Sequence, residues 1–107
     1  RVVKTEREIK EIIRRFSEEV ERLGAKPEGV LLYGSYAKGN PREDSDIDLI
    51  VISPDFKRMN LRERLELLGL AAGRVFEPIE AMGYTREEVE ANRKGTFLEE
   101  ILKGVEV

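Results

Sequence analysis

The sequence predicts a small α/β (α+β) domain in which helices back a mixed β-sheet, in the order αβαβαβαα(β). Three observations support this prediction. Helical repeats of apolar residues alternate with short apolar runs, glycine or proline bounds most segments, and no internal repeat or linker separates them. A length of 107 residues suits one domain. We therefore expect residues 1–107 to form a single domain, with an N-terminal helix over 5–23 and a core over about 29–107.

The N-terminal helix is predicted from its start signal and its repeat. Thr5 and Glu8 have the spacing of a capping box, and Gly24 is a natural stop. Between them the apolar positions recur at helical spacing: Ile9, Ile12, Ile13, Phe16, Val20 and Leu23. Residues 30–33 then form a short apolar run, which predicts a buried strand, and a short helix over 35–38 follows.

The second half of the chain repeats this alternation. A strand over 46–52 begins half-polar and becomes wholly apolar before Pro54 ends it. Asn60 caps the next helix, whose predicted buried stripe is Leu61, Leu65, Leu68 and Ala72. A third strand is expected over 74–82, where Pro78 implies an edge position or a bulge. The last expected elements are a helix capped by Thr85, a helix over 97–102 and a strand over 105–107.

The composition limits the chemistry that is available. Charged residues reach 38% but the net charge is only -3, so no basic surface for extended nucleic acid is evident. With no Cys and no His, disulfides, cysteine nucleophiles and Ser-His-Asp triads are excluded. No membrane-length apolar run or signal peptide is visible, so we expect a cytoplasmic protein without membrane contact. Abundant Glu, Lys and Arg, with no Gln, predict a thermophilic source.

A candidate phosphate-binding turn begins at Gly34. The absence of a Cβ there lets a phosphate approach the backbone, Ser35 adds a hydroxyl, and the following N–H groups attract anions. Lys38, one helical turn later, adds a positive charge. Gly and Ser also favour ordinary strand–turn–helix junctions, and taken alone this turn fits that structural interpretation better.

A candidate metal site follows at Asp46 and Asp48. Two residues apart on a strand, both carboxylates point to one face, roughly 7 Å apart at Cα. Asp is unfavourable in strands, and such a pair is repulsive without a cation, although polar strand ends are also common. A third acid comes from Glu80 or Glu77. These residues are three apart, so a regular strand would place them on opposite faces, and only one of them could face the site. The pattern alone leaves that choice open.

The combined pattern G-S-x-x-x-G-x-x-x-x-x-S-D-I-D-L resembles the nucleotidyltransferase superfamily that includes DNA polymerase beta. More narrowly, it is similar to the small stand-alone branch, the minimal nucleotidyltransferases. The similarity covers about 29–107, and the stretch 80–88 resembles that branch's third-acid strand leading into a Thr-capped helix. The resemblance implies a nucleotidyltransferase fold and favours Glu80 over Glu77.

The resemblance also implies roles for the site residues. Gly34 and Ser35 would contact the β- and γ-phosphates, with Lys38 and Ser45 as further nucleotide-binding residues. The catalytic and metal-binding carboxylates would be Asp46, Asp48 and Glu80, which would hold two Mg²⁺ ions or, in their place, Mn²⁺. The sequence departs from the branch in two respects. Tyr36 and Lys38 stand where the branch frequently has Arg, and Glu80 stands where it frequently has Asp.

The expected function is Mg²⁺-dependent transfer of a nucleoside monophosphate from an NTP to a hydroxyl acceptor. The first expectation is transfer of AMP from ATP. No second domain is evident to hold the acceptor, so a partner would present it. The resemblance points to a helical, toxin-like partner protein and an antitoxin role, with RNA as another acceptor. Exposed edge strands also favour homodimerisation, but the sequence leaves the oligomeric state open.

Two alternatives remain at this stage. The chain could be a non-catalytic antitoxin or regulatory subunit that retains a nucleotide–metal site and masks its partner sterically. An aminoglycoside-type nucleotidyltransferase is disfavoured, because those enzymes need an additional substrate domain.

Overall fold

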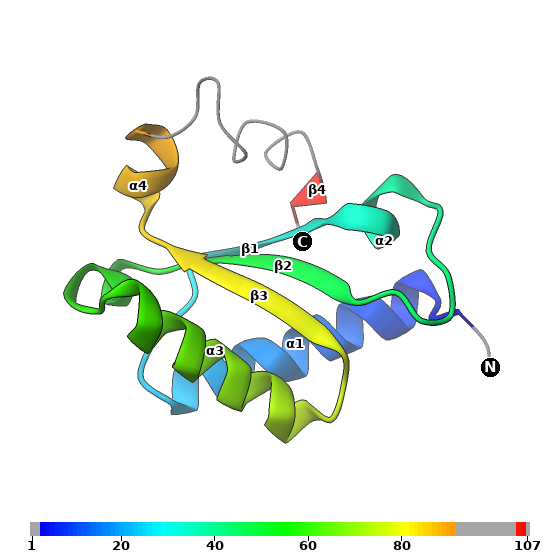
Figure 1. Ribbon diagram of the computed structural model, residues 1–107, viewed down its shortest axis with the longest axis horizontal. Helices are drawn as coiled ribbons and strands as arrows, with labels where there is room; N and C mark the ends of the chain where they lie inside the picture. The colour runs from blue at the N-terminus through cyan, green and yellow to red at the C-terminus, as the bar shows by residue number, and fades with distance from the viewer. Residues whose placement is uncertain (1–2, 92–104, 107) are drawn as a thin grey trace.

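The computed structural model describes residues 3–91 and 105–106 and shows the predicted mixed α/β architecture (Figure 1). Its elements, in chain order, are α1 Glu6–Arg22, β1 Gly29–Tyr33, α2 Gly34–Lys38, β2 Ile47–Ile52, the 3₁₀ turn η1 Pro54–Arg58, α3 Leu61–Val75, β3 Ile79–Tyr84, α4 Arg86–Ala91 and β4 Val105–Glu106. The predicted order is confirmed for these elements. The helix expected over 97–102 lies outside the described residues.

The strands form one mixed sheet in the order β3-β2-β1-β4. β1 pairs antiparallel with β2 and β4, whereas β2 pairs parallel with β3. The parallel pair is joined through η1 and α3, the kind of crossover that parallel strands require. In this described sheet β3 is an edge strand, as the position of Pro78 predicts.

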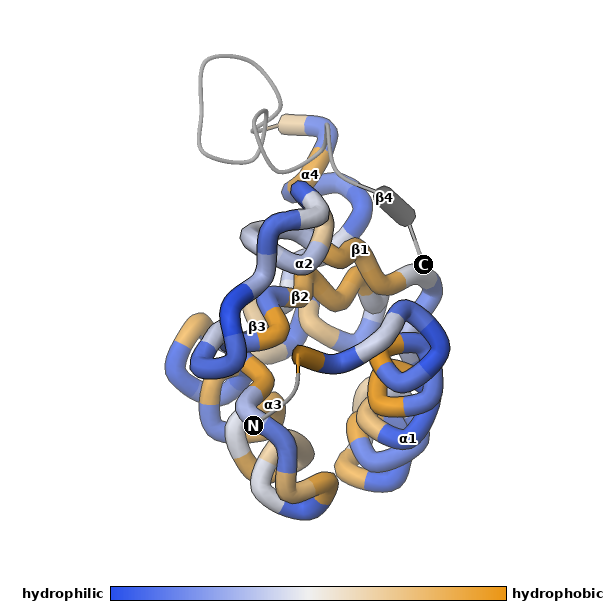
Figure 2. The backbone as a smooth tube through the Cα atoms, turned by 90° about the vertical axis from the view of Figure 1, so that its right-hand side faces the viewer, coloured by the Kyte–Doolittle hydropathy of each residue, from blue (hydrophilic) through white to orange (hydrophobic). Residues whose placement is uncertain are grey.

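The helices α1 and α3 lie side by side against one face of the sheet (Figures 1 and 2). Strand alternation divides β2 between two environments. Ile47, Leu49 and Val51 pack with α1 and α3, whereas Ile50 and Ile52 lie on the opposite face together with Val89 of α4. Asp48 shares the parity of Ile50, so its side chain belongs to the face that α1 and α3 do not cover.

The local start signals work as the sequence predicts. Thr5 and Glu8 form the expected capping box of α1, and Asn60 and Glu63 form one at α3. Each cap satisfies backbone donors that a helix leaves without partners at its first turn. Within the described residues, no helix has the length and apolar character needed to cross a bilayer.

The third strand begins later than predicted. The expectation of a strand from residue 74 is wrong, because α3 continues to Val75 and β3 starts at Ile79. Val75 is buried with Ala71 and Leu68, so its apolar side chain stabilises another turn of helix. Phe76 then ends α3 in the left-handed conformation, with φ 60° and its side chain 91% exposed.

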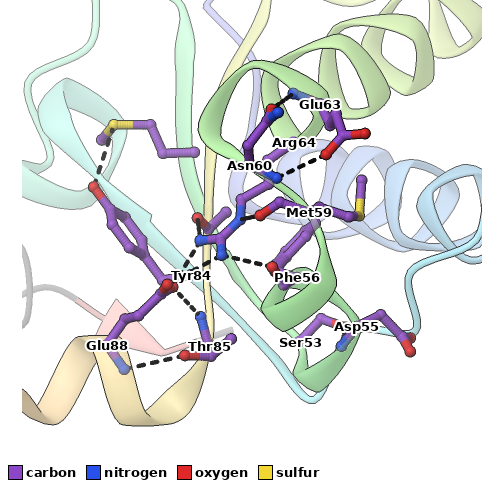
Figure 3. Close-up of polar contacts among 12 residues, drawn as sticks. Ser53, Asp55, Phe56, Met59, Asn60, Glu63, Arg64, Tyr84, Thr85 and Glu88 are labelled. Atoms are coloured by element: carbon purple, nitrogen blue, oxygen red, sulfur yellow. Dashed lines mark hydrogen bonds and ion pairs between the residues drawn. The ribbon is translucent and has the colours of Figure 1, made fainter.

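The predicted buried stripe of α3 is also wrong in part. Leu68 is buried, but Leu61 and Leu65 are 66% and 46% exposed. The buried face consists of Arg64, Leu68, Ala71 and Val75. Arg64 accounts for this orientation, because its guanidinium donates hydrogen bonds to the carbonyl oxygens of Phe56 and Gly83 and to the carboxylate of Glu88 (Figure 3).

Candidate functional site

The turn at Gly34 and the carboxylate of Asp48 are in direct contact. β1 ends at Tyr33, and Gly34 opens α2 with φ 74°, a backbone conformation that favours glycine. A Cβ at Gly34 would clash with Oδ2 of Asp48. Glycine is therefore required here both for its backbone angle and for the space that Asp48 occupies. The Gly34 turn and the aspartate pair lie twelve or more residues apart in the sequence, but they are adjacent in the fold.

Strand register then builds a row of polar side chains across the sheet. Asp48 of β2 stands opposite Tyr33 of β1 and opposite Glu80 of β3. Asp46 lies just before β2 and is exposed. Tyr33 is a site residue that the sequence reasoning missed. Its position as the last residue of the strand before Gly34 could have indicated it, since that places it beside the candidate phosphate-binding turn.

The electrostatics of this row follow from burial and from like charges. Burial raises the pKa of Asp48 above its ordinary value of 3.8, and the negative charges of Glu80 and Asp46 raise it further. Burial also raises the pKa of the Tyr33 hydroxyl to about 12, with further contributions from the charges of Asp48 and Glu80. A cation bound among these carboxylates would relieve their repulsion.

The structure distinguishes the two candidates for the third acid. Glu77 precedes β3 and forms ion pairs with Lys4 at 3.5 Å and with Arg15 of α1 at 3.6 Å. Glu80 lies within β3, exposed, in register with Asp48. The choice that the sequence pattern leaves open is therefore resolved in position: Glu80, and not Glu77, lies beside Asp48.

The three carboxylates do not form a complete metal cage by themselves. Within residues 3–91 and 105–106, no group of three or more acidic, His or Cys side chains is arranged to hold a metal ion. The assignment of Asp46, Asp48 and Glu80 to metal ions therefore stays a prediction. Asp46 and Glu80 are both exposed, and like charges on neighbouring carboxylates repel one another.

The remaining predicted nucleotide-binding residues lie around the same turn. Ser35 is half-buried in α2, and Lys38 is exposed at the end of that helix. The Ser45 hydroxyl accepts a hydrogen bond from the Arg42 N–H at 2.8 Å, which closes the loop before β2. That oxygen keeps its own hydrogen available for donation.

A separate hollow of about 480 Å³ lies between α1 and α2. Its apolar lining includes Ile9, Ile13, Leu32 and Tyr36, with Lys4 and Lys10 also on its wall. None of the candidate carboxylates belongs to it. The candidate site is accordingly a sheet surface beside a turn, and this hollow is not part of it.

Replacing Gly34 by Ala should disrupt the site more than the fold. The new methyl group would displace the Asp48 carboxylate, while the positive φ would cost about 1 kcal/mol of stability. For the nucleotide–metal site that the sequence predicts, we expect nucleotide binding in the presence of Mg²⁺ to fall at least about tenfold. Gly39→Ala is the matched control, because Gly39 has φ 79° but open space around its Cβ position. Equal losses in both variants would contradict the proposed importance of the Gly34–Asp48 contact.

The raised pKa of Asp48 predicts a pH-dependent gain in stability for Asp48→Asn. A carboxyl whose folded pKa exceeds its unfolded pKa binds protons more strongly in the folded state, so wild-type stability falls as pH rises above about 3.8. Without metal, the Tm of the variant should therefore exceed that of wild type at neutral pH, and the difference should shrink toward acid pH. Asp55→Asn should show the opposite sign, because hydrogen bonding with the Lys26 N–H lowers the pKa of Asp55. A constant Tm difference across pH would refute this account.

Comparisons with known proteins agree with this geometry. A family model described as nucleotidyltransferase domain matches residues 13–104. A protein of Methanocaldococcus jannaschii described as a "putative protein adenylyltransferase" is 40% identical over 68 residues, covering 60% of this chain and 78% of its own. A crystal structure of a nucleotidyltransferase, also described as "putative", has a TM-score of 0.55 at 26% identity, covering 92% of this chain and 96% of the other. One from Sulfolobus solfataricus, with the same qualifier, has a TM-score of 0.50 at 23% identity and 85% coverage of both chains, and supports the fold alone.

Proposed function

Because this chain belongs to the nucleotidyltransferase domain family, we propose that it transfers a nucleoside monophosphate, with ATP as the first candidate donor, to a hydroxyl acceptor. One observation carries the proposal. The glycine of the turn leaves space that the Asp48 carboxylate occupies, and Asp48 stands in register with Glu80. A triphosphate held by the turn would thus meet the carboxylates that its metal ions need.

The oxygen donors of this site suit Mg²⁺. That ion commonly takes only one or two carboxylates from a protein and completes its shell with substrate phosphates and water. An incomplete carboxylate group is therefore compatible with a metal that arrives with its nucleotide. We assign Asp46 and Asp48 to two Mg²⁺ ions, replaceable by Mn²⁺, and Glu80 to one of them. Bound there, the ions would neutralise phosphate charge and lower the pKa of the attacking hydroxyl.

The chain's own residues would orient the reactants. Gly34 and Ser35 would bind the β- and γ-phosphates, and Lys38 and Ser45 would add further polar contacts. The acceptor oxygen would bond to the α-phosphorus as the bond from that phosphorus to the bridging oxygen breaks, and pyrophosphate would leave with that electron pair. The hydroxyl proton would pass to the exposed Glu80.

The acceptor is proposed to be a hydroxyl group on a partner protein. The M. jannaschii relative is described as a "putative protein adenylyltransferase", which supports this acceptor class. The helical toxin-like partner and the antitoxin role are proposed from the family resemblance, and the cytoplasmic location and the single domain over 1–107 from the length and composition of the sequence. RNA is the second acceptor class to be tested.

Incubation with α-labelled nucleoside triphosphates and Mg²⁺ tests the proposal. The reactions would contain the chain alone, the chain with a co-encoded helical protein, or the chain with RNA. We expect label on the partner protein that depends on Mg²⁺ and is greatest with ATP. The label should disappear with γ-labelled ATP, because the γ-phosphate leaves within pyrophosphate. Absence of transfer from every nucleotide to every acceptor would refute the catalytic proposal.

A non-catalytic binding subunit is the second candidate. The exposed leucines of α3 favour it, because they offer an apolar surface to a partner. A double variant, Asp46→Asn with Asp48→Asn, separates the candidates. If this variant neutralises the partner as well as wild type does, masking rather than nucleotidyl transfer is the function.

A further inference from the structure

The outer edge of β3 carries backbone groups without partners in the described sheet. β3 ends the strand order, so only β2 pairs with it. The Pro78 and Tyr84 carbonyls accept hydrogen bonds from the N–H groups of Ile47 and Ser53, toward β2. In a parallel pair the bonding residues alternate, so the residues between them, Ile79, Ala81 and Gly83, direct their backbone groups outward.

Two of these outward groups already have internal partners. The Ile79 N–H donates to the Glu77 carbonyl at 2.8 Å, and the Gly83 carbonyl accepts from Arg64 at 3.3 Å. The outward groups left over are the Ile79 carbonyl, both groups of Ala81 and the Gly83 N–H. Across residues 3–91 and 105–106, no hydrogen bond to these four groups is found.

The four remaining groups are complementary, donor to acceptor, to the same four groups of a second copy of the chain. An antiparallel pairing of β3 with β3 of another copy, with a two-fold axis at Ala81, sets Ala81 against Ala81 and Ile79 against Gly83. The two Ala81 residues would exchange N–H and carbonyl bonds, and each Gly83 N–H would donate to an Ile79 carbonyl. The bond this register lacks would join the Ile79 N–H to the Gly83 carbonyl, the two groups already satisfied internally.

We propose that this chain forms a two-fold dimer through antiparallel pairing of β3 centred on Ala81, with the outer flanks of α3 packed together beneath the joined sheets. The proposal stands on backbone geometry and does not depend on the proposed enzymatic function. Two copies would then share one continuous sheet.

The α3 helix supplies the second half of this surface. Its exposed flank carries Leu61, Leu65, Gly69 and Gly73, of which Leu61 and Leu65 are 66% and 46% exposed. A Cβ at Gly69 or Gly73 would meet nothing within 4 Å, and neither residue has a positive φ. Glycine disfavours the helix interior, so the fold of one copy does not explain these residues. Close approach of a second helix does.

The strand and the helix place the two-fold axis at the same level. Arg64 of α3 reaches the Gly83 carbonyl, which aligns the start of α3 with the end of β3. Five helical residues from Arg64 to Gly69 rise about 7.5 Å. Two strand residues from Gly83 to Ala81 cover about 6.6 Å. To within the length of the Arg64 side chain, these rises place Gly69 near the level of Ala81, where the two copies of α3 would approach most closely.

Charge and area are compatible with a weak dimer. In this register Glu80 faces Met82 of the second copy, so the two Glu80 carboxylates are not directly opposed. The antiparallel α3 helices also bring opposite ends of their dipoles together. The surface is about 22 Å long and two layers, about 20 Å, deep, or about 440 Å² in projection, which is below the ~600 Å² per partner that marks the upper end of weak interfaces. We therefore expect a concentration-dependent dimer.

The second copy would also contribute to the candidate site. Met82 of that copy would lie beside Glu80, on the sheet face that carries Asp48. This apolar neighbour would reduce the exposure of Glu80 to water. The site would accordingly be more enclosed in the dimer than in a single copy.

Sedimentation velocity over a wide range of protein concentration tests the proposal. We expect an apparent mass that rises from 12.3 kDa toward twice that value. Ala81→Pro removes one of the central donors, and Gly69→Lys places like charges at the axis, so each should weaken dimerisation at least about tenfold. Gly69→Lys replaces glycine by a better helix former, so its Tm at low concentration should not fall. Loss of the dimer in this variant therefore cannot be attributed to unfolding.

Leu70→Lys is the matched control. Leu70 is 53% exposed on α3, but it lies on a different side of the helix from Leu65. We expect Leu65→Lys to weaken the dimer and Leu70→Lys to leave it unchanged. A wild-type chain that stays monomeric at every concentration would overturn the proposal. So would a dimer that resists Ala81→Pro and Gly69→Lys, or one that Leu70→Lys weakens equally.

Discussion

Asp48→Asn should abolish nucleotidyl transfer in a protein that is at least as stable as wild type. The variant keeps the shape of the side chain next to Gly34 but removes the charge that a Mg²⁺ ion would bind. We expect turnover to fall at least about 100-fold. Mg²⁺ with ATP should raise the Tm of wild type and leave that of the variant unchanged, because only wild type would bind the metal–nucleotide pair tightly.

Two comparisons make this result specific. Asp46→Asn should reduce turnover less, since Asp46 is exposed and stands outside β2, whereas Asp48 lies between Tyr33 and Glu80. Glu77→Gln should leave turnover intact, because Glu77 pairs with Lys4 and Arg15. Full activity in Asp48→Asn would show that transfer does not need this carboxylate and would contradict the proposed site.

Arg64→Leu should destabilise the fold by about 3–5 kcal/mol, a large share of the total for a domain of this size. Arg64 is 8% exposed and donates to the carbonyl oxygens of Met59, Gly83 and Phe56 at 3.0, 3.3 and 2.5 Å. It also binds both carboxylate oxygens of Glu88, at 2.7 and 3.0 Å (Figure 3). Its removal leaves buried acceptors without a donor. Denaturant unfolding measures the loss.

An exposed arginine on the same helix and the pH dependence due to Glu88, the partner of Arg64, test this interpretation. Arg62→Leu, on an exposed side chain of the same helix, should change stability by less than about 0.5 kcal/mol. Hydrogen bonding to Arg64 lowers the pKa of Glu88, so wild type should lose stability as pH falls below about 4.5, the ordinary value for Glu. That acid-dependent loss should be smaller in Arg64→Leu. A mild effect of Arg64→Leu, comparable with that of Arg62→Leu, would show that the network is dispensable.

Local signals in the sequence predicted much of the fold. Thr5 and Asn60 act through residues three positions away, so their caps are visible without tertiary structure. Arg64 illustrates the opposite case. Its burial depends on carbonyl groups from η1 and β3, and a sequence pattern treats a charged residue as exposed. For this reason the buried face predicted for α3 is rotated about the helix axis relative to the face that is buried in the structure.

The candidate site divides in the same way. Asp46 and Asp48 were predicted from spacing within one segment, and Gly34 from its place before a short helix. Choosing Glu80 over Glu77 by geometry required the register between β2 and β3, which no single segment contains. Tyr33 was missed because its neighbour Asp48 comes from another strand.

The alternation of β2 has a consequence for how this domain could be engineered. Ile47, Leu49 and Val51 contact the helices, while Asp48 belongs to the opposite face with Ile50. Changes to the first set alter the packing that keeps the chain folded, and changes at Asp48 alter what the surface can bind. Asp48 is bonded directly to Ile47 and Leu49, and the effects of substitutions at adjacent residues are not additive in general. Thermal tolerance and substrate choice would therefore have to be optimised together along this strand, with both faces varied in one library.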